Sequence, residues 1–338
     1  MRPLALFTLC ASVAYAETPK DFTGWEDVNQ FECNAPLGQF DPPDVRGYEG
    51  FKYEHTGSTL KLRREKPRAS KAAKLGVIAG IKDLEPETKA QLQRFFADFD
   101  KADVDLIVIG GDTAEEPDVL DAIYGFLATA TRRPMIAIAG NTERAAAHTY
   151  AINKVRKTGV NHLLNGDVIR RVDGDGFDLV TLAGYYDKRY LHLSGGCLYS
   201  EKALADVEQA VAASDDAVVF LSHGPPRQKG QHALDYVPGA DNVGDPQLTD
   251  LITRAKIPFG IFGHIIEAGG NATDLAGKPL PQKKPQPALY LNQGSCNPLP
   301  WKMNDGTTSY GLAAILTVEG KKASYEILRA PKPAPPAP

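Results

Sequence analysis

The chain has 338 residues and a formal net charge of −4, with 24% charged and 43% hydrophobic residues. This small negative charge gives no indication of nucleic-acid binding, which favours a basic surface. The length fits one α/β domain or two.

The N-terminus has the pattern of a secretory signal peptide. Residues 4–13 form an apolar run after Met1-Arg2-Pro3, and Ala14-Tyr15-Ala16 supplies the small residues of a cleavage site. We therefore predict a signal peptide at 1–16, cleaved before Glu17, and a secreted or periplasmic protein. The apolar run is shorter than the roughly 20 residues that a membrane-spanning helix needs, and no later run comes closer, so no membrane span is expected.

A lipoprotein is the less favoured alternative for this N-terminus. Cys10 would be the lipid-bearing residue, but Leu9 stands immediately before it. Lipid attachment normally requires a small residue at that place. Signal-peptide cleavage would remove Cys10 and leave Cys33, Cys197 and Cys296, an odd number that allows at most one intramolecular disulfide.

Residues 17–70 are predicted to be a loop-rich extension that ends in a hairpin. Strands at 51–53 and 60–62 flank the turn Thr56-Gly57-Ser58. The segment 61–74 carries many basic residues, and we expect a solvated linker or edge strand there rather than an anion-binding patch.

From 71 to 329, strand-length apolar runs alternate with segments of helical period, which is typical of βαβ units and a parallel sheet covered on both faces. The predicted strands are 75–79, 106–109, 135–139, 179–182, 217–221, 259–262 and 289–291. The predicted helices are 86–102, 117–130, 144–157, 201–213 and 246–255. Strands 312–318 and 323–328 close the domain as a hairpin, and residues 330–338 form a Pro/Ala-rich tail predicted to be disordered.

Polar side chains follow several of these strands where each strand ends. Asp112 follows the strand 106–109, Asn141 follows 135–139, His223 follows 217–221, and His264 follows 259–262. Because the carboxyl ends of parallel strands meet at one edge of a sheet, these side chains should lie together. Carboxylate and amide oxygens with imidazole nitrogens suit one divalent ion such as Zn, Mn or Fe.

The order of these motifs resembles the metallophosphoesterases, also called calcineurin-like phosphoesterases. That family carries DxH, GDxxD, GNHE or GNHD, a single His and GHxH in this order, and the chain offers GIK, GDTAE, GNTE, SHGPP and GHII. The resemblance extends from about residue 75 to 328 and includes LNQGS, which is similar to the family's NPGS element. It implies a two-sheet α/β sandwich flanked by helices.

The resemblance also implies that one of the family's two metal sites persists. The ligands of one metal correspond to Asp112, Asn141, His223 and His264, and all four residue types are present. The other metal additionally needs the Asp and His of DxH and the last His of GHxH, where this chain has Gly80, Lys82 and Ile266. We infer that the second site was lost as a unit.

Two further predictions concern the lost site. The Lys82 ammonium can replace the missing cation and neutralise Asp112, since unit charges about 4 Å apart attract by about 4 kcal/mol at an effective dielectric near 20. The alternative is that Lys82 points to solvent. A rival register would instead place Asp83 and Glu85 in the DxH positions and restore carboxylates there.

The predicted function is a divergent phosphoesterase with one metal, acting on a phosphomonoester or phosphodiester outside the cytoplasm. The family's His in GNH is Thr142 here, so an acid worth roughly 10²- to 10⁴-fold is missing from that position. Lys82 and Thr142 are the candidate catalytic residues, and Glu115 and Glu143 are candidates for orienting the ligands. The alternative is a non-catalytic protein of this fold that binds a ligand or an envelope protein partner.

Overall fold

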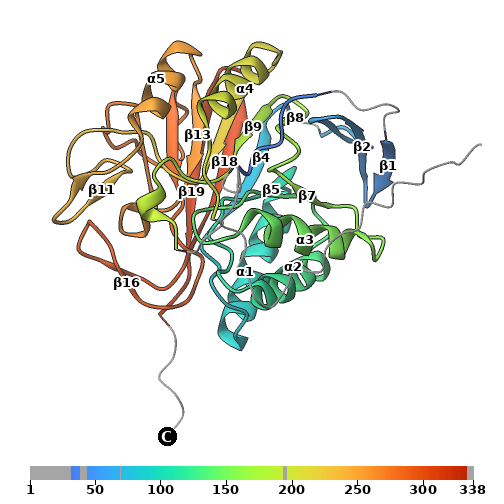
Figure 1. The fold of residues 1–338 in the computed structure, drawn as a ribbon, viewed down its shortest axis with the longest axis horizontal. Coiled ribbons are helices and arrows are strands. Elements are labelled where there is room, and N and C mark those ends of the chain that lie inside the picture. Colours follow the sequence, from blue (N-terminus) through green and yellow to red (C-terminus); the bar gives the residue numbers. More distant parts are fainter. Residues whose placement is uncertain (1–31, 39–43, 69, 193–195, 333–338) are drawn as a thin grey trace, which may run out of the picture.

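The computed structural model describes residues 32–38, 44–68, 70–192 and 196–332 (Figure 1). The predicted signal peptide, Cys10 and residues 333–338 of the predicted tail lie outside the described residues. Within the described part of the chain, no helix is long and apolar enough to cross a membrane.

The described residues form five α-helices, and all five were predicted. They are α1 (Pro86–Ala102), α2 (Pro117–Ala130), α3 (Ala145–Arg156), α4 (Glu201–Ala212) and α5 (Pro246–Arg254). Proline begins α1, α2 and α5, where its fixed φ suits the first turn and its missing N–H costs nothing. This signal explains why the predicted first residues of these helices agree with the structure.

Two large sheets form the centre of the molecule. The six-stranded sheet has the order β19-β18-β4-β5-β6-β7, and the nine-stranded sheet has the order β1-β2-β3-β8-β9-β10-β13-β15-β14. The first contains β4 (Ala73–Ile78), β5 (Leu106–Ile109), β6 (Met135–Ala137), β7 (Leu163–Asn165), β18 (Leu312–Glu319) and β19 (Lys322–Arg329). The second contains β1 (Asp44–Tyr48), β2 (Phe51–Thr56), β3 (Thr59–Arg64), β8 (Arg171–Asp173), β9 (Asp178–Leu182), β10 (Val218–Ser222), β13 (Phe259–Phe262), β14 (Asn271–Thr273) and β15 (Leu289–Asn292).

Short elements lie outside these sheets. They are the ladder of β11 (Tyr236–Val237) with β12 (Asp241–Asn242), the ladder of β16 (Trp301–Lys302) with β17 (Thr308–Ser309), and the 3₁₀ turns η1 (Lys188–Tyr190) and η2 (Ile266–Ala268).

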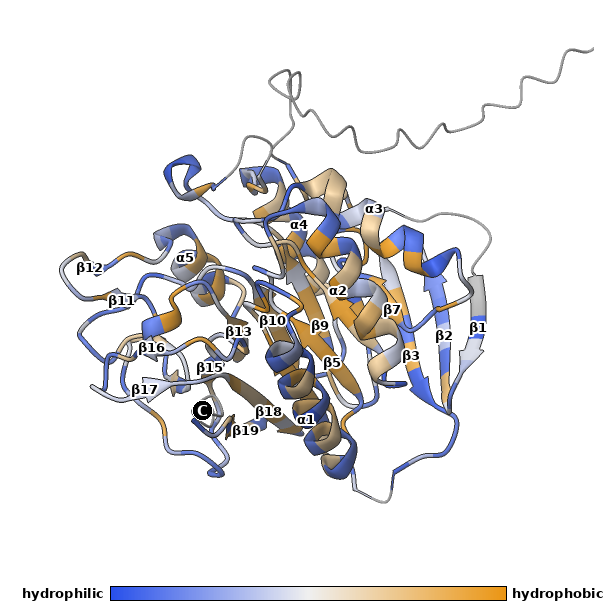
Figure 2. Cartoon of the chain, turned by 90° about the horizontal axis from the view of Figure 1, so that it is seen from below, coloured by the Kyte–Doolittle hydropathy of each residue, from blue (hydrophilic) through white to orange (hydrophobic). Residues whose placement is uncertain are grey.

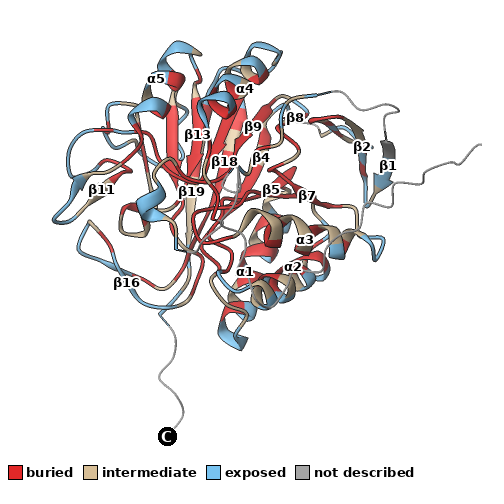
Figure 3. Cartoon of the chain, viewed as in Figure 1, coloured by how far each residue is buried: buried red, intermediate tan, exposed pale blue. Residues whose placement is uncertain are grey.

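Alternating side chains of the central strands build three apolar layers. Val77 and Val108 face the nine-stranded sheet, whereas their neighbours Ile78 and Ile109 pack against α1–α3. On the other sheet, Leu179 and Val219 face inward while Val180 and Phe220 pack against α4 and α5. Figure 1 shows α1–α3 together on one side and α4 with α5 on the other, and Figures 2 and 3 show the apolar, buried strands between them. The predicted two-sheet α/β sandwich flanked by helices is confirmed.

The predicted N-terminal hairpin is present as β2 and β3, but the expectation of an edge strand in the basic segment is wrong. β3 pairs with β2 on one side and with β8 on the other, so it is an internal strand of the nine-stranded sheet. Its basic side chains are satisfied by carboxylates: Arg63 pairs with Asp173, and Arg64 pairs with Asp105. An internal position is therefore compatible with this charge.

A disulfide joins the N-terminal segment to the main domain. Cys33 and Cys197 are bonded with their Cα atoms 5.3 Å apart, and they are 164 residues apart in the sequence. Cys296 is a free, buried thiol whose pKa burial raises to about 12. The sequence allowed one disulfide among these three cysteines, and the structure identifies the pair.

Removal of the disulfide is expected to destabilise the protein measurably. In a Cys33→Ala, Cys197→Ala variant, the free energy of unfolding should fall by about 3–5 kcal/mol, because the crosslink closes a very long loop in the unfolded chain. Urea unfolding measures this change. A reducing agent should shift the parent by a similar amount and leave the variant unchanged; a variant as stable as the parent would contradict the prediction.

Candidate metal centre

The site lies where the carboxyl ends of parallel strands from both sheets meet. β4, β5 and β6 are parallel neighbours in one sheet, and β10, β13 and β15 are parallel neighbours in the other. The loops after these strands bring Asp112, Asn141, His223 and His264 together. Asp112, His223 and His264 each offer a ligand atom, and these atoms lie within 4.8 Å of one another. The predicted juxtaposition of the four residues is therefore observed, while their role as metal ligands stays a prediction.

Hydrogen bonds fix the orientation of the central groups. His223 Nδ1 lies 2.8 Å from the Gly110 carbonyl oxygen, which can only accept, so Nδ1 carries the proton and donates it. The Asn141 amide nitrogen donates to the Tyr190 carbonyl at 2.7 Å, which turns Asn141 Oδ1 toward the imidazoles. These two hydrogen bonds assign the tautomer of His223 and the orientation of the Asn141 amide.

These assignments leave lone pairs facing one another. His223 Nε2 lies 2.8 Å from Asn141 Oδ1 and 3.1 Å from Asp112 Oδ1, and His264 Nδ1 lies 2.9 Å from Asn141 Oδ1. In a neutral His223 ring, Nε2 is an acceptor opposed by two oxygen acceptors. Such a cluster requires a positive charge, which a divalent ion or a proton on Nε2 can supply. The oxygen and imidazole donors suit a borderline divalent ion, so the residues fit the predicted metal.

Lys82 occupies the other side of Asp112. Its Nζ donates to Asp112 Oδ2 at 2.7 Å, and one third of the side chain is exposed. Burial by itself lowers the pKa of Lys82, but Asp112 outweighs burial and raises it. Burial likewise favours a protonated Asp112, yet His223 and Lys82 hold the pKa of this carboxyl well below its usual range. The hypothesis that the Lys82 ammonium neutralises Asp112 agrees with this geometry, and the alternative of a purely solvated Lys82 does not.

The two histidines have opposite protonation preferences. Burial lowers the pKa of His223, but the Asp112 carboxylate outweighs burial and raises it. Burial, followed by the neighbouring His223, lowers the pKa of His264 to about 3. His264 is therefore a neutral imidazole at physiological pH, the form that can donate a lone pair to a metal.

The rival register is wrong. Asp83 accepts from the Asn297 side chain at 2.7 Å and from Thr88, and Glu85 is an exposed residue immediately before α1. Among the described residues, no contact joins the carboxylate of Asp83 or of Glu85 to Asp112.

Backbone conformation at the site is unusual. Lys82, Asp112 and His264 have φ of 72°, 56° and 62°, in the left-handed region that non-glycine residues seldom adopt. Gly111 also has a positive φ of 89°, and a Cβ there would lie 2.7 Å from His223 Nδ1. Strained conformations persist where the surroundings impose them, and they concentrate at functional sites.

The Glu143 side chain stabilises this strained backbone through hydrogen bonds. Its carboxylate is fully buried and accepts from the backbone N–H groups of Asp112 at 3.2 Å, Gly140 at 2.7 Å and Thr113. Glu143 therefore orients the loops that carry Asp112 and Asn141, as expected of a residue that supports ligands. Glu115, the other candidate for this role, instead lies half-exposed beside His192, with 3.6 Å between Oε2 and Nδ1.

Thr142 lies beside the site but its hydroxyl is already used. It is 2% exposed and donates to Asp112 Oδ1 at 3.2 Å. An aliphatic hydroxyl is also a very weak acid. The candidate catalytic role of Thr142 is thus reduced to holding Asp112.

Several residues at the site were not identified from the sequence. The Tyr185 ring lies 4.2 Å from the His264 ring between centroids, and Tyr190 supplies the carbonyl that orients Asn141. Ser295 and Asn297 secure the strand end before Lys82 by donating to the carbonyls of Gly80 at 2.7 Å and Ile81 at 2.6 Å. No local motif marks the tyrosines, whereas Ser295 belongs to the LNQGS segment that the sequence had singled out.

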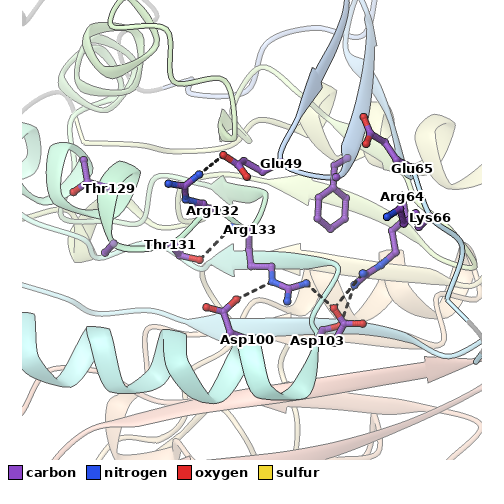
Figure 4. A pocket seen from close by; sticks show the side chains of 13 residues that line it. Glu49, Arg64, Glu65, Lys66, Asp100, Asp103, Thr129, Thr131, Arg132 and Arg133 are labelled. Carbon is purple, nitrogen blue, oxygen red and sulfur yellow. Dashed lines mark hydrogen bonds and ion pairs between the residues drawn. The ribbon is translucent and has the colours of Figure 1, made fainter.

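The site opens into a pocket of about 380 Å³. Lys82, Asp112, Asn141 and His264 line it together with side chains from the segment 295–312. A larger pocket of about 710 Å³ lies beneath the β1–β2 hairpin (Figure 4).

Several charged groups of that larger pocket are paired with one another. Arg133 binds Asp100 at 2.8 Å and Asp103 at 2.7 Å, and Arg64 binds Asp103 at 3.1 Å (Figure 4). These ion pairs join the C-terminal end of α1 to β3 and to the segment before β6. We therefore assign them to the fold, and the pocket beside Asp112 is the functional candidate.

Comparison with known proteins gives a family match over more than half of the chain. The profile of the calcineurin-like phosphoesterase family matches residues 78–268, a segment that contains Lys82 and the four candidate ligands. No curated protein sequence is a significant match to the chain.

Several solved structures align with the chain at low sequence identity. One aligns with 13% identity and a TM-score of 0.54 over 75% of this chain and 98% of its own. A dimetal phosphatase from Danio rerio aligns with 12% identity and a TM-score of 0.45 over 76% of this chain and 98% of its own. GAP50, described as the anchor in the inner membrane complex of Plasmodium, aligns with 11% identity and a TM-score of 0.46 over 76% of this chain and 84% of its own.

Proposed function

Because the chain belongs to the calcineurin-like phosphoesterase family, we propose that it hydrolyses a phosphomonoester or phosphodiester with one divalent metal ion. One observation carries the proposal. Asp112 Oδ1, Asn141 Oδ1 and His223 Nε2 direct lone pairs toward one another and therefore require a cation. The Lys82 ammonium binds the other Asp112 oxygen, Oδ2. The four candidate ligands would thus bind one metal ion, and the Lys82 ammonium takes the place of the second metal ion.

These positions suggest a separate role for each residue of the site. Asp112, Asn141, His223 and His264 would hold the ion, which would polarise a phosphoryl oxygen and lower the pKa of water. Lys82 uses one N–H for Asp112 and has two more beside the pocket, so it can bind a phosphoryl oxygen. Thr142 supplies no proton to the leaving group, so substrates with acidic leaving groups should react best.

A non-catalytic role is the second candidate, and the buried, hydrogen-bonded hydroxyl of Thr142 favours it. The position where the family has an acidic His carries a buried hydroxyl bonded to Asp112. A protein of this kind would bind an anionic ligand or an envelope protein partner through the same pocket without turnover.

Metal-dependent hydrolysis separates the two candidates. The mature protein is treated with chelator, reconstituted with Zn, Mn or Fe, and assayed with p-nitrophenyl phosphate and bis(p-nitrophenyl) phosphate. The proposal predicts turnover that needs metal and falls by at least about 100-fold in His223→Ala. His232→Ala, which changes an exposed histidine, should behave as the parent.

The remaining outcomes decide between the candidates. Metal binding without turnover of either ester would favour the non-catalytic candidate. A parent that turns over both esters equally well with and without chelator would contradict the metal requirement.

Simple reversion of the three lost positions is not expected to rebuild a second metal site. Gly80 has a φ of 60°, and a Cβ there would lie 2.9 Å from Ser295 Oγ. A Gly80→Asp, Lys82→His, Ile266→His variant should therefore bind at most one metal per chain and melt below the parent. Metal analysis and thermal unfolding measure this, with Lys82→His, Ile266→His as the control that keeps Gly80. Two bound metals at an unchanged melting temperature would contradict the prediction.

We further propose that the protein acts outside the cytoplasm. The leader pattern at residues 1–16 supports export. The Cys33–Cys197 disulfide also supports it, because disulfides persist in oxidising compartments. N-terminal sequencing of protein from an osmotic-shock fraction should find Glu17 as the first residue.

A further inference from the structure

Large apolar side chains are exposed around the candidate site. Among the described residues, the large hydrophobic side chains that remain exposed are Tyr190 at 36%, Leu299 at 66% and Trp301 at 43%. Leu299 and Trp301 line the 380 Å³ pocket, and the Tyr190 ring lies 6.2 Å from the His264 ring between centroids. Exposed apolar side chains gathered in one place mark a surface that binds something apolar.

The pocket is lined by side chains of two kinds. Lys82, Asp112 and His264 are among its polar side chains, and Glu267, Ser295 and Asn297 also line it. Its apolar lining, called here the apolar wall, consists of Ile266, Leu299, Trp301, Met303 and Leu312. Ile266 stands where the resemblance places a ligand of the second metal, so loss of that site supplied part of the apolar wall. The volume falls in the range of small-molecule sites and exceeds what a phosphate group alone would fill.

The apolar wall is held in place by hydrogen bonds. β16, which contains Trp301, pairs with β17, and the Asn304 N–H donates to the Glu267 carbonyl at 2.8 Å. The Asn304 side chain donates to the Tyr236 carbonyl at 2.9 Å. Trp301 is thus presented on an ordered ladder next to η2, and a preorganised surface loses little conformational entropy on binding.

We propose that this pocket selects phosphoesters whose organic group is aromatic or bulky and apolar. The phosphoryl oxygens lie at Lys82, and the organic group packs on Trp301 and Leu299. The inference rests on the proposed function, because it places the phosphoryl group at the candidate metal centre. It goes further in naming what is attached to the phosphate.

Binding of two phosphonates tests the proposal without turnover, because a phosphoesterase does not cleave their C–P bonds. Calorimetric titration of the full mature protein compares (1-naphthyl)methylphosphonate with methylphosphonate. The parent should bind the naphthyl compound at least about tenfold more tightly. Trp301→Ala should reduce this preference about three- to tenfold, and Trp301→Phe should retain most of it.

Matched variants make the outcome specific. Leu299→Ser changes a 66%-exposed side chain and should also reduce the preference without lowering the melting temperature. Lys82→Met should weaken both phosphonates and leave their ratio unchanged. Equal affinity of the parent for the two phosphonates, no binding of either, or a ratio unchanged in both Trp301→Ala and Leu299→Ser would overturn the proposal.

The same titration distinguishes this inference from the proposed function. A naphthyl preference in a protein that hydrolyses neither chromogenic ester would retain the inference and favour the non-catalytic candidate. Metal-dependent hydrolysis without a naphthyl preference would retain the proposed function and overturn the inference alone.

Discussion

Asp112→Asn is expected to reduce metal affinity and kcat/KM for a chromogenic phosphodiester by at least about 100-fold each. The substitution keeps the shape of the side chain and removes the charge that faces His223 on one oxygen and Lys82 on the other. Without that charge, the Lys82 ammonium loses its counter-ion and a divalent ion loses its only carboxylate among the four candidate ligands. Titration with Mn and steady-state kinetics measure the two quantities.

A second aspartate provides the control for this substitution. Asp250 is exposed on α5, so Asp250→Asn should leave metal affinity, turnover and melting temperature as in the parent. If Asp112→Asn bound metal and turned over substrate as the parent does, the assignment of Asp112 to the metal centre would be wrong.

Glu143→Ala is expected to cause the largest loss of stability among single substitutions at the site. Its carboxylate accepts hydrogen bonds from three buried backbone N–H groups, and each unsatisfied donor costs about 1–3 kcal/mol, so the free energy of unfolding should fall by about 3–9 kcal/mol. This is a large part of the roughly 5–15 kcal/mol by which domains are stable. Urea unfolding followed by circular dichroism measures the change.

The control for this prediction separates backbone support from charge. Glu87 is an exposed glutamate in the first turn of α1, and Glu87→Ala should alter stability by less than about 1 kcal/mol. A Glu143→Ala variant as stable as Glu87→Ala would show that the three N–H groups find other partners.

The long periodic elements could be predicted from the sequence because local signals fix them. Both ends of α1 and α2 were predicted, since proline begins each helix and an apolar stripe runs along it. The three-residue strands β7, β8 and β14 were missed, whereas β6, which is equally short, was predicted within the longer apolar run 135–139. A short strand outside such a run has too little pattern to detect and forms through its neighbours.

The composition of the site was predicted better than its conformation. The order of the motifs brought Asp112, Asn141, His223 and His264 together, and it indicated that Lys82 could neutralise Asp112. The left-handed backbone at three site residues could not be predicted, because the surrounding hydrogen bonds impose it. The apolar wall was also missed, since Trp301 reaches the pocket from a segment far along the chain.

Metal content of the purified mature protein, measured by plasma mass spectrometry after reconstitution with Zn or Mn, tests the single-metal centre most directly. The parent should hold one ion per chain, and an Asp112→Asn, His264→Ala variant should hold none. No bound ion in the parent would show that a proton on His223 supplies the positive charge, and two ions per chain would show that Lys82 has not replaced the second metal; either result would contradict the single-metal account.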